Sequence, residues 1–121
     1  MKILLSIKPP YVKNILNQKK RFEYRKTSPQ RDIDTIVIYS TYPDMKVVGE
    51  VKVIELLSDT PENLWKLTQQ YAGISNKAYM NYFSNKKIAY AYKLGDVLIF
   101  DTPKTLADYG LNQAPQSFVY L

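Results

Sequence analysis

The strongly apolar residues of this chain come in short runs of three or four, such as Val97–Phe100, separated by proline and polar turn residues. A helix that crosses a membrane needs about 20 consecutive apolar residues, so no membrane span is expected. Runs this short are typical of β-strands. We therefore predict a fold rich in strands, placed at residues 3–7, 21–25, 35–40, 47–57, 88–92, 97–100 and 117–121.

Three segments carry helix signals. The spacing of apolar residues over 11–16 predicts a short helix, and Pro10 suits its first turn. Thr60, followed by a proline and a glutamate, is typical of a helix N-terminus, and Gly73 is expected to end that helix. A further helix is predicted over 75–83, with a serine as its N-cap.

The elements are joined by short polar segments. We expect a loop at 27–34, a turn at 93–96, a loop with one helical turn over 103–111, and a bulge at Gly49 in a long strand. The resulting order, β-α-β-β-β-α-α-β-β-β, favours an α+β fold: a small mixed β-barrel of about six strands with two to three helices packed outside. No repeat or linker interrupts it, so residues 1–121 are predicted to form a single domain.

The chain contains no cysteine and no histidine. Disulfides, thiolate nucleophiles, Ser-His triads and His- or Cys-ligated metals are therefore excluded, and we expect neither a metal nor a cofactor. The apolar part of residues 1–6 is too short for a signal peptide, so a cytoplasmic location is predicted.

Positive charge is concentrated at the start of the chain. Residues 1–26 carry a net charge of +7, whereas the remaining 95 residues carry −1. A field this concentrated favours a phosphate-bearing or otherwise anionic partner. The alternative is a solvated, lysine-rich face without a ligand.

Strand 21–25 alternates charged and aromatic side chains. Phe22 and Tyr24 are expected to face the core, with Arg21, Glu23 and Arg25 on the opposite face. If this strand neighbours strand 3–7, basic side chains from both converge on a cleft suited to phosphate and to the hydrogen-bonding edges of a base. The predicted ligand-binding residues are Ser6, Lys8, Tyr11, Lys20, Glu23 and Arg25, with Lys19 nearby.

Several of these residues allow two interpretations. Glu23 is either an ion-pair partner of its basic neighbours or a group that orients Lys20 or accepts a proton. Ser40 and Thr41 are cap or turn residues by default, and they contact a ligand only if strand 35–40 ends beside the cleft. Exposed tyrosines can stack on unpaired bases, whereas those in the strand patterns are expected in the core.

The N-terminal residues resemble the opening of the ASCH domain, a family within the PUA-like superfamily. The similarity lies in Leu5–Tyr11 and in a Gly-x-Lys-x-x-Glu-x-Arg run, whose Lys, Glu and Arg match Lys20, Glu23 and Arg25. Gln18 occupies the position of the usual glycine, which implies a different turn. The similarity continues through residues 39–43, 48–51, 64–65 and 115–120. It implies a PUA-like barrel.

The resemblance implies binding of RNA or single-stranded nucleic acid in a cleft between barrel and helix. Some small members of the family are amidohydrolases that deacetylate N4-acetylcytidine nucleosides with a lysine, a threonine and a second carboxylate. Lys20 matches that lysine, but Glu23 occupies the threonine position, and a carboxylate does not replace a hydroxyl nucleophile. Glu50 and Glu55 are the nearest candidates for the second carboxylate.

Three functional hypotheses follow. The first is an RNA-binding module, with a regulatory role, in which the cleft holds RNA or a nucleotide. The second is an amidohydrolase of modified nucleosides in which Lys20 and Glu23 are the catalytic pair. The third is a regulatory domain that binds a nucleotide or a small anion.

Overall fold

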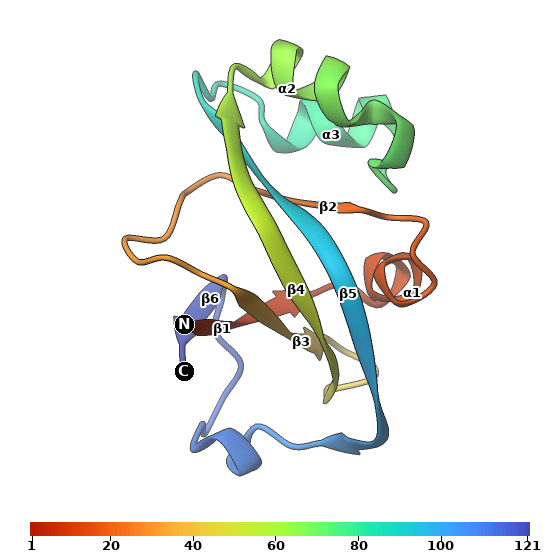
Figure 1. Cartoon of the computed structure of the whole chain (residues 1–121), viewed down its shortest axis with the longest axis vertical. Coiled ribbons are helices and arrows are strands. Elements are labelled where there is room, and N and C mark those ends of the chain that lie inside the picture. Colours follow the sequence, from red (N-terminus) through yellow and green to blue (C-terminus); the bar gives the residue numbers. More distant parts are fainter.

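The computed structural model describes residues 1–121 as one curled, six-stranded mixed sheet with three helices outside it (Figure 1). The strand order across the sheet is β2-β5-β4-β3-β1-β6, in which β1 and β3 run parallel and the other neighbours antiparallel. The strands are β1 (Lys2–Ile7), β2 (Phe22–Arg25), β3 (Thr35–Ser40), β4 (Lys46–Asp59), β5 (Ala89–Lys104) and β6 (Phe118–Tyr120). The helices are α1 (Pro9–Leu16), α2 (Pro61–Thr68) and α3 (Asn76–Tyr82). This architecture confirms the predicted small mixed β-barrel of about six strands with two to three helices outside.

The parallel pair β1 and β3 forms the centre of the structure. Both strands are buried on both faces, as expected of parallel strands. On one face, residues such as Ile3 and Ile38 pack with Val12 and Ile15 of α1. On the other face, a smaller cluster around Val37 is covered by residues of the C-terminal segment.

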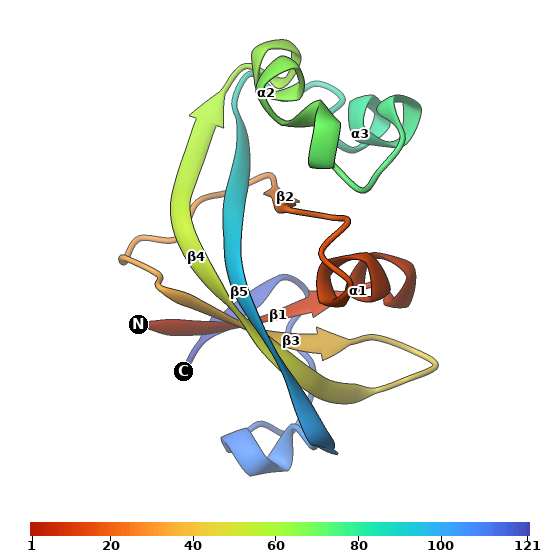
Figure 2. The ribbon, with the colours of Figure 1, turned by 45° about the vertical axis from the view of Figure 1, so that its right-hand side comes forward.

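A second core lies under α2 and α3. Tyr79 of α3 is fully buried and contacts Tyr24 of β2 with ring centroids 4.9 Å apart, in an edge-to-face arrangement. Leu64 and Phe83 complete this cluster. The two helices therefore form a cap anchored on β2 and on the far ends of the two long strands (Figure 2).

The predicted helix starts are confirmed. The Thr60 hydroxyl accepts a hydrogen bond from the backbone N–H of Asn63 at 3.2 Å, and the Ser75 hydroxyl accepts one from Ala78 at 3.1 Å. No helix of the structure is long and apolar enough to cross a membrane.

The predicted turn at 93–96 is wrong, because β5 continues through it from Ala89 to Lys104. Leu94 is buried within the strand, and a Cβ added to Gly95 would lie 3.2 Å from the Ile54 side chain of β4. Irregular pairing on both sides of Val53 lets the two strands bend together without a break. The residues that predict a turn at 93–96 also allow a strand to bend. The two strands predicted at 88–92 and 97–100 are therefore one strand, β5.

Gly49 lies beside an irregularity in the pairing of β4, as the predicted bulge requires. A Cβ at this position would stand 2.4 Å from the backbone oxygen of Leu98. The close approach of β4 and β5 therefore needs a residue without a side chain. The predicted helical turn in 103–111 is the 3-10 turn Ala107–Tyr109.

The turn after α1 brings the chain back toward β2. Gln18 adopts a left-handed conformation with φ of +65°, which glycine reaches without strain. The different turn that the glutamine implied is therefore not observed: the backbone has the conformation that suits the family's glycine. Gln18 carries the steric cost of a side chain at that φ.

Gln18→Gly is expected to raise the free energy of unfolding by about 1 kcal/mol, because it removes the strain of a Cβ at positive φ. The contact that it loses, from Arg21 to the Gln18 amide, is exposed and 3.4 Å long. Urea unfolding followed by circular dichroism measures the change. Gln113→Gly, at an exposed position without positive φ, is the control and is expected to lower stability. Lower stability of Gln18→Gly would contradict the prediction.

Candidate functional site

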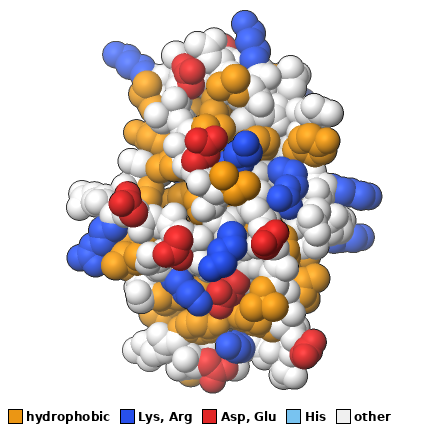
Figure 3. Space-filling model, in the orientation of Figure 1, with side chains coloured by type: hydrophobic (Ala, Val, Ile, Leu, Met, Phe, Trp, Pro, Cys, Tyr) orange, Lys and Arg blue, Asp and Glu red, His pale blue; other side chains and the backbone are white.

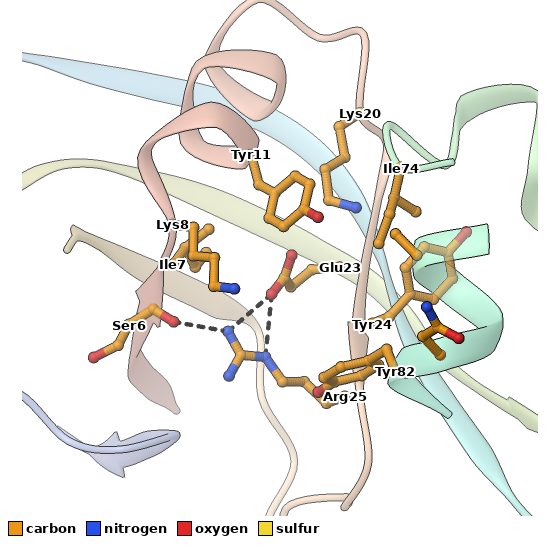
Figure 4. Close-up of a pocket in the computed structure, with 12 residues that line it drawn as sticks. Ser6, Ile7, Lys8, Tyr11, Lys20, Glu23, Tyr24, Arg25, Ile74 and Tyr82 are labelled. Carbon is orange, nitrogen blue, oxygen red and sulfur yellow. Dashed lines mark hydrogen bonds and ion pairs between the residues drawn. The ribbon is translucent and has the colours of Figure 1, made fainter. Parts of the chain in front are cut away.

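A cavity of about 530 Å³ opens between α1, β2 and α3. Strand β2 forms its floor, the end of β1 and the start of α1 form one wall, and α3 forms the other (Figure 4). Figure 2 shows α1 and α3 on opposite sides of β2. The six predicted residues from the N-terminal region all line this cavity: Ser6, Lys8, Tyr11, Lys20, Glu23 and Arg25.

The floor of the cavity holds a buried ion pair. The Nε and Nη2 atoms of Arg25 both donate to one carboxylate oxygen of Glu23, Oε2, at 3.1 and 2.8 Å. Arg25 Nη2 also donates to the backbone oxygen of Ser6 at 3.1 Å. Glu23 is 6% exposed, so its charge needs this partner. The guanidinium thus ties β2 to β1 and holds the carboxylate in place.

Lys20 is the most deeply buried charged residue of the chain, with 2% exposure. Its Nζ donates to the backbone oxygen of Ala72 at 2.6 Å and lies 4.8 and 5.3 Å from the ring centroids of Tyr24 and Tyr11. It forms no ion pair with a carboxylate. Burial lowers the pKa of Lys20, and the Arg25 charge lowers it further, against an opposing effect of Glu23.

Glycine at position 73 makes room for Lys20. Gly73 has φ of +64°, and a Cβ there would lie 2.4 Å from Lys20 Cβ and 2.5 Å from its Cγ. A neighbouring hydrogen bond, from Arg21 N to the Tyr71 oxygen at 2.9 Å, holds the turn after α1 against residues 71–73. The helical cap and the turn after α1 therefore meet around the Lys20 side chain.

The two walls carry different chemistry. Lys8 at the rim is exposed and Tyr11 is half-buried, whereas the Ser6 hydroxyl is engaged with the Pro115 oxygen at 2.7 Å. The α3 wall brings Asn81 and Tyr82, together with Ile74 and Ala78. Lys26 lies over the Tyr82 ring at 4.7 Å from its centroid.

Two predicted ligand contacts lie outside the cavity. Strand β3 does end beside β1, but the buried Ser40 hydroxyl donates to Asp44 at 2.7 Å. The backbone N–H of Thr41 donates to the Ile7 oxygen at 3.0 Å. Both residues thus support the turn after β3, the role expected of them by default.

Other expectations about charged residues also change. Arg21 precedes β2 and does not share the face of Glu23; its guanidinium donates to the backbone oxygens of Leu94 and Gly95. Glu50 pairs with Lys2 at 3.0 Å, and Glu55 lines a different cavity, so neither supplies a second carboxylate beside Lys20. Lys19 is exposed and does not line the cavity.

Sequence reasoning missed the α3 wall and Ser117. Tyr82 and Asn81 belong to a segment whose apolar spacing indicates only a helix, and no local signal points to a ligand. The Ser117 hydroxyl lies 3.5 Å from Arg25 Nη1, because β6 pairs with β1 at the edge of the sheet. The only sequence signal for Ser117 was the resemblance of residues 115–120 to the ASCH domain. No group of three or more acidic side chains is placed to hold a metal ion.

A second, smaller cavity of about 340 Å³ lies between residues 29–33 and strands β4 and β5. Figure 3 shows acidic and basic side chains interspersed over the strands, with basic side chains projecting at the edge where α1 lies. The positive charge of the N-terminal region is therefore divided. Part of it lies at the floor of the cavity as buried Lys20 and partly buried Arg25, and part is exposed around α1.

Comparisons with known proteins match this chain to one family. Residues 5–104 match the model of the ASCH domain. The crystal structure of ASCH from Zymomonas mobilis superposes with a TM-score of 0.90, at 27% identity, covering 99% of this chain and 87% of that chain. An ASCH domain-containing ribonuclease of the same organism is 29% identical over 94 residues, which are 77% of this chain and 64% of that protein.

A longer relative contains a similar segment. The ATP synthase subunit alpha of Ureaplasma parvum is 28% identical over 120 residues, which are 98% of this chain but 15% of that protein. This chain therefore spans less than two thirds of the length of both the ATP synthase subunit and the ribonuclease.

Gly73→Ala is expected to lower the free energy of unfolding by about 3 kcal/mol, because it adds a clash with Lys20 to the strain of a side chain at positive φ. Gly110→Ala is the matched control: φ is +74° there, but no atom lies within 4 Å of the new Cβ. It should cost about 1 kcal/mol. Urea unfolding measures both, and equal losses would show that Lys20 accommodates the methyl group.

The lowered pKa of Lys20 predicts a pH dependence of stability. Between this pKa and the ordinary value of 10.5, the unfolded chain binds more protons than the folded one, so Lys20 makes folding more favourable as the pH rises. The stability of the wild type relative to Lys20→Met should therefore increase from pH 7 to pH 10. Lys66→Met, at an exposed lysine, serves as the control. A constant difference for Lys20→Met would argue against the lowered pKa.

Proposed function

The chain belongs to the ASCH domain family, and on this premise we propose that it binds single-stranded RNA through the cavity between α1, β2 and α3. The observation that carries the proposal is the cavity floor, where a buried lysine and an arginine-held carboxylate stand together beneath a basic rim. Such a floor offers fixed polar groups for orienting a ligand, while the rim attracts its charge.

The dimensions and walls of the cavity suit one nucleotide. A volume of about 530 Å³ lies within the range of pockets that enclose small ligands. Tyr11 and Tyr82 line opposite walls, where aromatic rings can stack on an unpaired base. Lys8 and Lys26 are both exposed and can contact phosphates outside the cavity.

The relatives favour RNA as the ligand. One of them is named a ribonuclease, and it matches 77% of this chain. The name of the much longer ATP synthase subunit alpha does not refer to RNA, so the support for RNA comes from the first relative and from the cavity.

Fluorescence anisotropy with a labelled 12-nucleotide single-stranded RNA tests the proposal. If the rim contacts two phosphates, affinity should fall about sevenfold between 50 and 200 mM salt, because each contact releases counterions. Lys8→Ala should weaken binding and flatten the salt dependence. Lys66→Ala removes an equally exposed lysine from α2, away from the cavity, and should leave binding unchanged. Absence of RNA binding, or equal effects of the two variants, would overturn the proposal.

A second candidate function is RNA cleavage, favoured by the lowered pKa of Lys20. In its neutral form, the Lys20 amine can accept the proton of a ribose 2′-hydroxyl as that oxygen attacks the adjacent phosphorus. The P–O5′ bond then breaks, and the products are a 2′,3′-cyclic phosphate and a 5′-hydroxyl end that has taken up a proton. Denaturing gels of the 12-mer reveal such cleavage, and product formation unchanged in Lys20→Met would exclude this role.

Amide hydrolysis of N4-acetylcytidine is the alternative reaction for the same pair. The carboxylate of Glu23 is engaged with Arg25, and it occupies the position of the family's hydroxyl nucleophile. The reaction therefore requires water as the nucleophile, with Lys20 or Glu23 accepting its proton. Acetate release from N4-acetylcytidine, compared between the wild type and Lys20→Met, tests this alternative.

A further inference from the structure

We propose that the cavity reads the Watson–Crick edge of one unpaired base. Glu23 accepts a hydrogen bond from an N–H of that edge, and Lys20 donates one to the acceptor atom beside it. This inference rests on the proposed binding of RNA and specifies which part of the ligand enters the cavity.

Glu23 has one oxygen left for a ligand. Both bonds from Arg25 reach Oε2, and Oε1 has no partner within the protein. Figure 4 shows the free oxygen on the side of the carboxylate that faces Tyr11 and Lys20, away from Arg25. Glu23 is 6% exposed, and the cavity is its access to solvent. Because an ionised carboxylate only accepts hydrogen bonds, the ligand must present a donor to it.

Lys20 supplies the complementary donor. An ammonium group has three N–H donors, and the single hydrogen bond that the Lys20 side chain makes within the protein is the one to the Ala72 oxygen. The rings of Tyr24 and Tyr11 flank the amine without accepting a conventional hydrogen bond from it. An acceptor atom of the ligand is therefore needed to satisfy a group that is 2% exposed.

The floor is unsuited to a phosphate group. The Arg25 guanidinium is engaged with Glu23 and with the Ser6 oxygen, and the Glu23 carboxylate repels a second anion. Exposed Lys8 at the rim offers a phosphate contact away from the floor. A neutral ligand edge with a donor next to an acceptor fits the floor better than an anion does.

Every base carries such an edge where it pairs with its complement. Uracil has N3–H beside O4, guanine has N1–H beside O6, and cytosine and adenine have an amino group beside a ring nitrogen. In a duplex these atoms are already hydrogen-bonded, so the cavity must select an unpaired nucleotide turned out of the stack. Tyr11 and Tyr82 on opposite walls can hold the faces of the base while its edge meets the floor.

The experiment compares a labelled hexamer of uridylate with the same strand methylated on the Watson–Crick edge, as 3-methyluridine, which remains uncharged. The edge methyl group should weaken binding by about tenfold or more, in line with the discrimination of a good base contact. A hexamer of 5-methyluridine carries its methyl group on the other edge and should bind like uridylate. Pairing the hexamer with its complement should also abolish cavity binding.

Glu23→Gln supplies the matching change in the protein. It removes the charge that accepts the base N–H, so the ratio of affinities for the plain and edge-methylated strands should approach one. Wild-type binding of edge-methylated strands as tight as of plain strands would overturn the Watson–Crick inference and leave RNA binding intact. Failure of every hexamer to bind would overturn both proposals. The ligand comparison with the wild type decides the question even if Glu23→Gln does not fold.

Discussion

The contact between Lys20 and the segment 71–73 is the constraint on which the cavity depends. Here the turn after α1 meets the cap of α2 and α3, through the Lys20 Nζ bond to Ala72 and the Arg21 backbone bond to Tyr71. A charged side chain is costly to bury, and a single hydrogen bond together with two aromatic faces offsets that cost only partly. Burial therefore lowers the pKa of Lys20. The width of the cavity depends on this contact.

The ion pair of Glu23 and Arg25 complements this arrangement on the other side of the floor. Arg25 joins β2 to the end of β1, two strands that are not neighbours in the sheet. Its two bonds to one oxygen of Glu23 fix the orientation of the carboxylate and leave the other oxygen free. The two interpretations of Glu23, as an ion-pair partner and as a ligand-facing group, are therefore compatible because they concern different oxygen atoms.

Local sequence signals predicted most of the elements and the N-terminal half of the candidate site. Capping residues such as Thr60 and Ser75 act within one turn of helix, so they can be recognised without tertiary information. The continuity of β5 through Gly95 depends on Ile54 of another strand, and no local pattern contains that contact. Helix packing likewise brings the α3 wall to the cavity, and strand pairing brings Ser117 to Arg25. Ser40 is engaged by Asp44 and does not line the cavity.

The edge of the sheet brings the two ends of the chain together. The backbone N–H of Leu121 donates to the Lys2 oxygen at 3.0 Å, and Figure 2 shows both ends on the side of the barrel opposite α1 and α3. A segment with this geometry can be inserted into a longer polypeptide as a module, since its entry and exit points coincide and neither crosses the cavity. The match of this chain to 15% of a much longer relative agrees with such modular use.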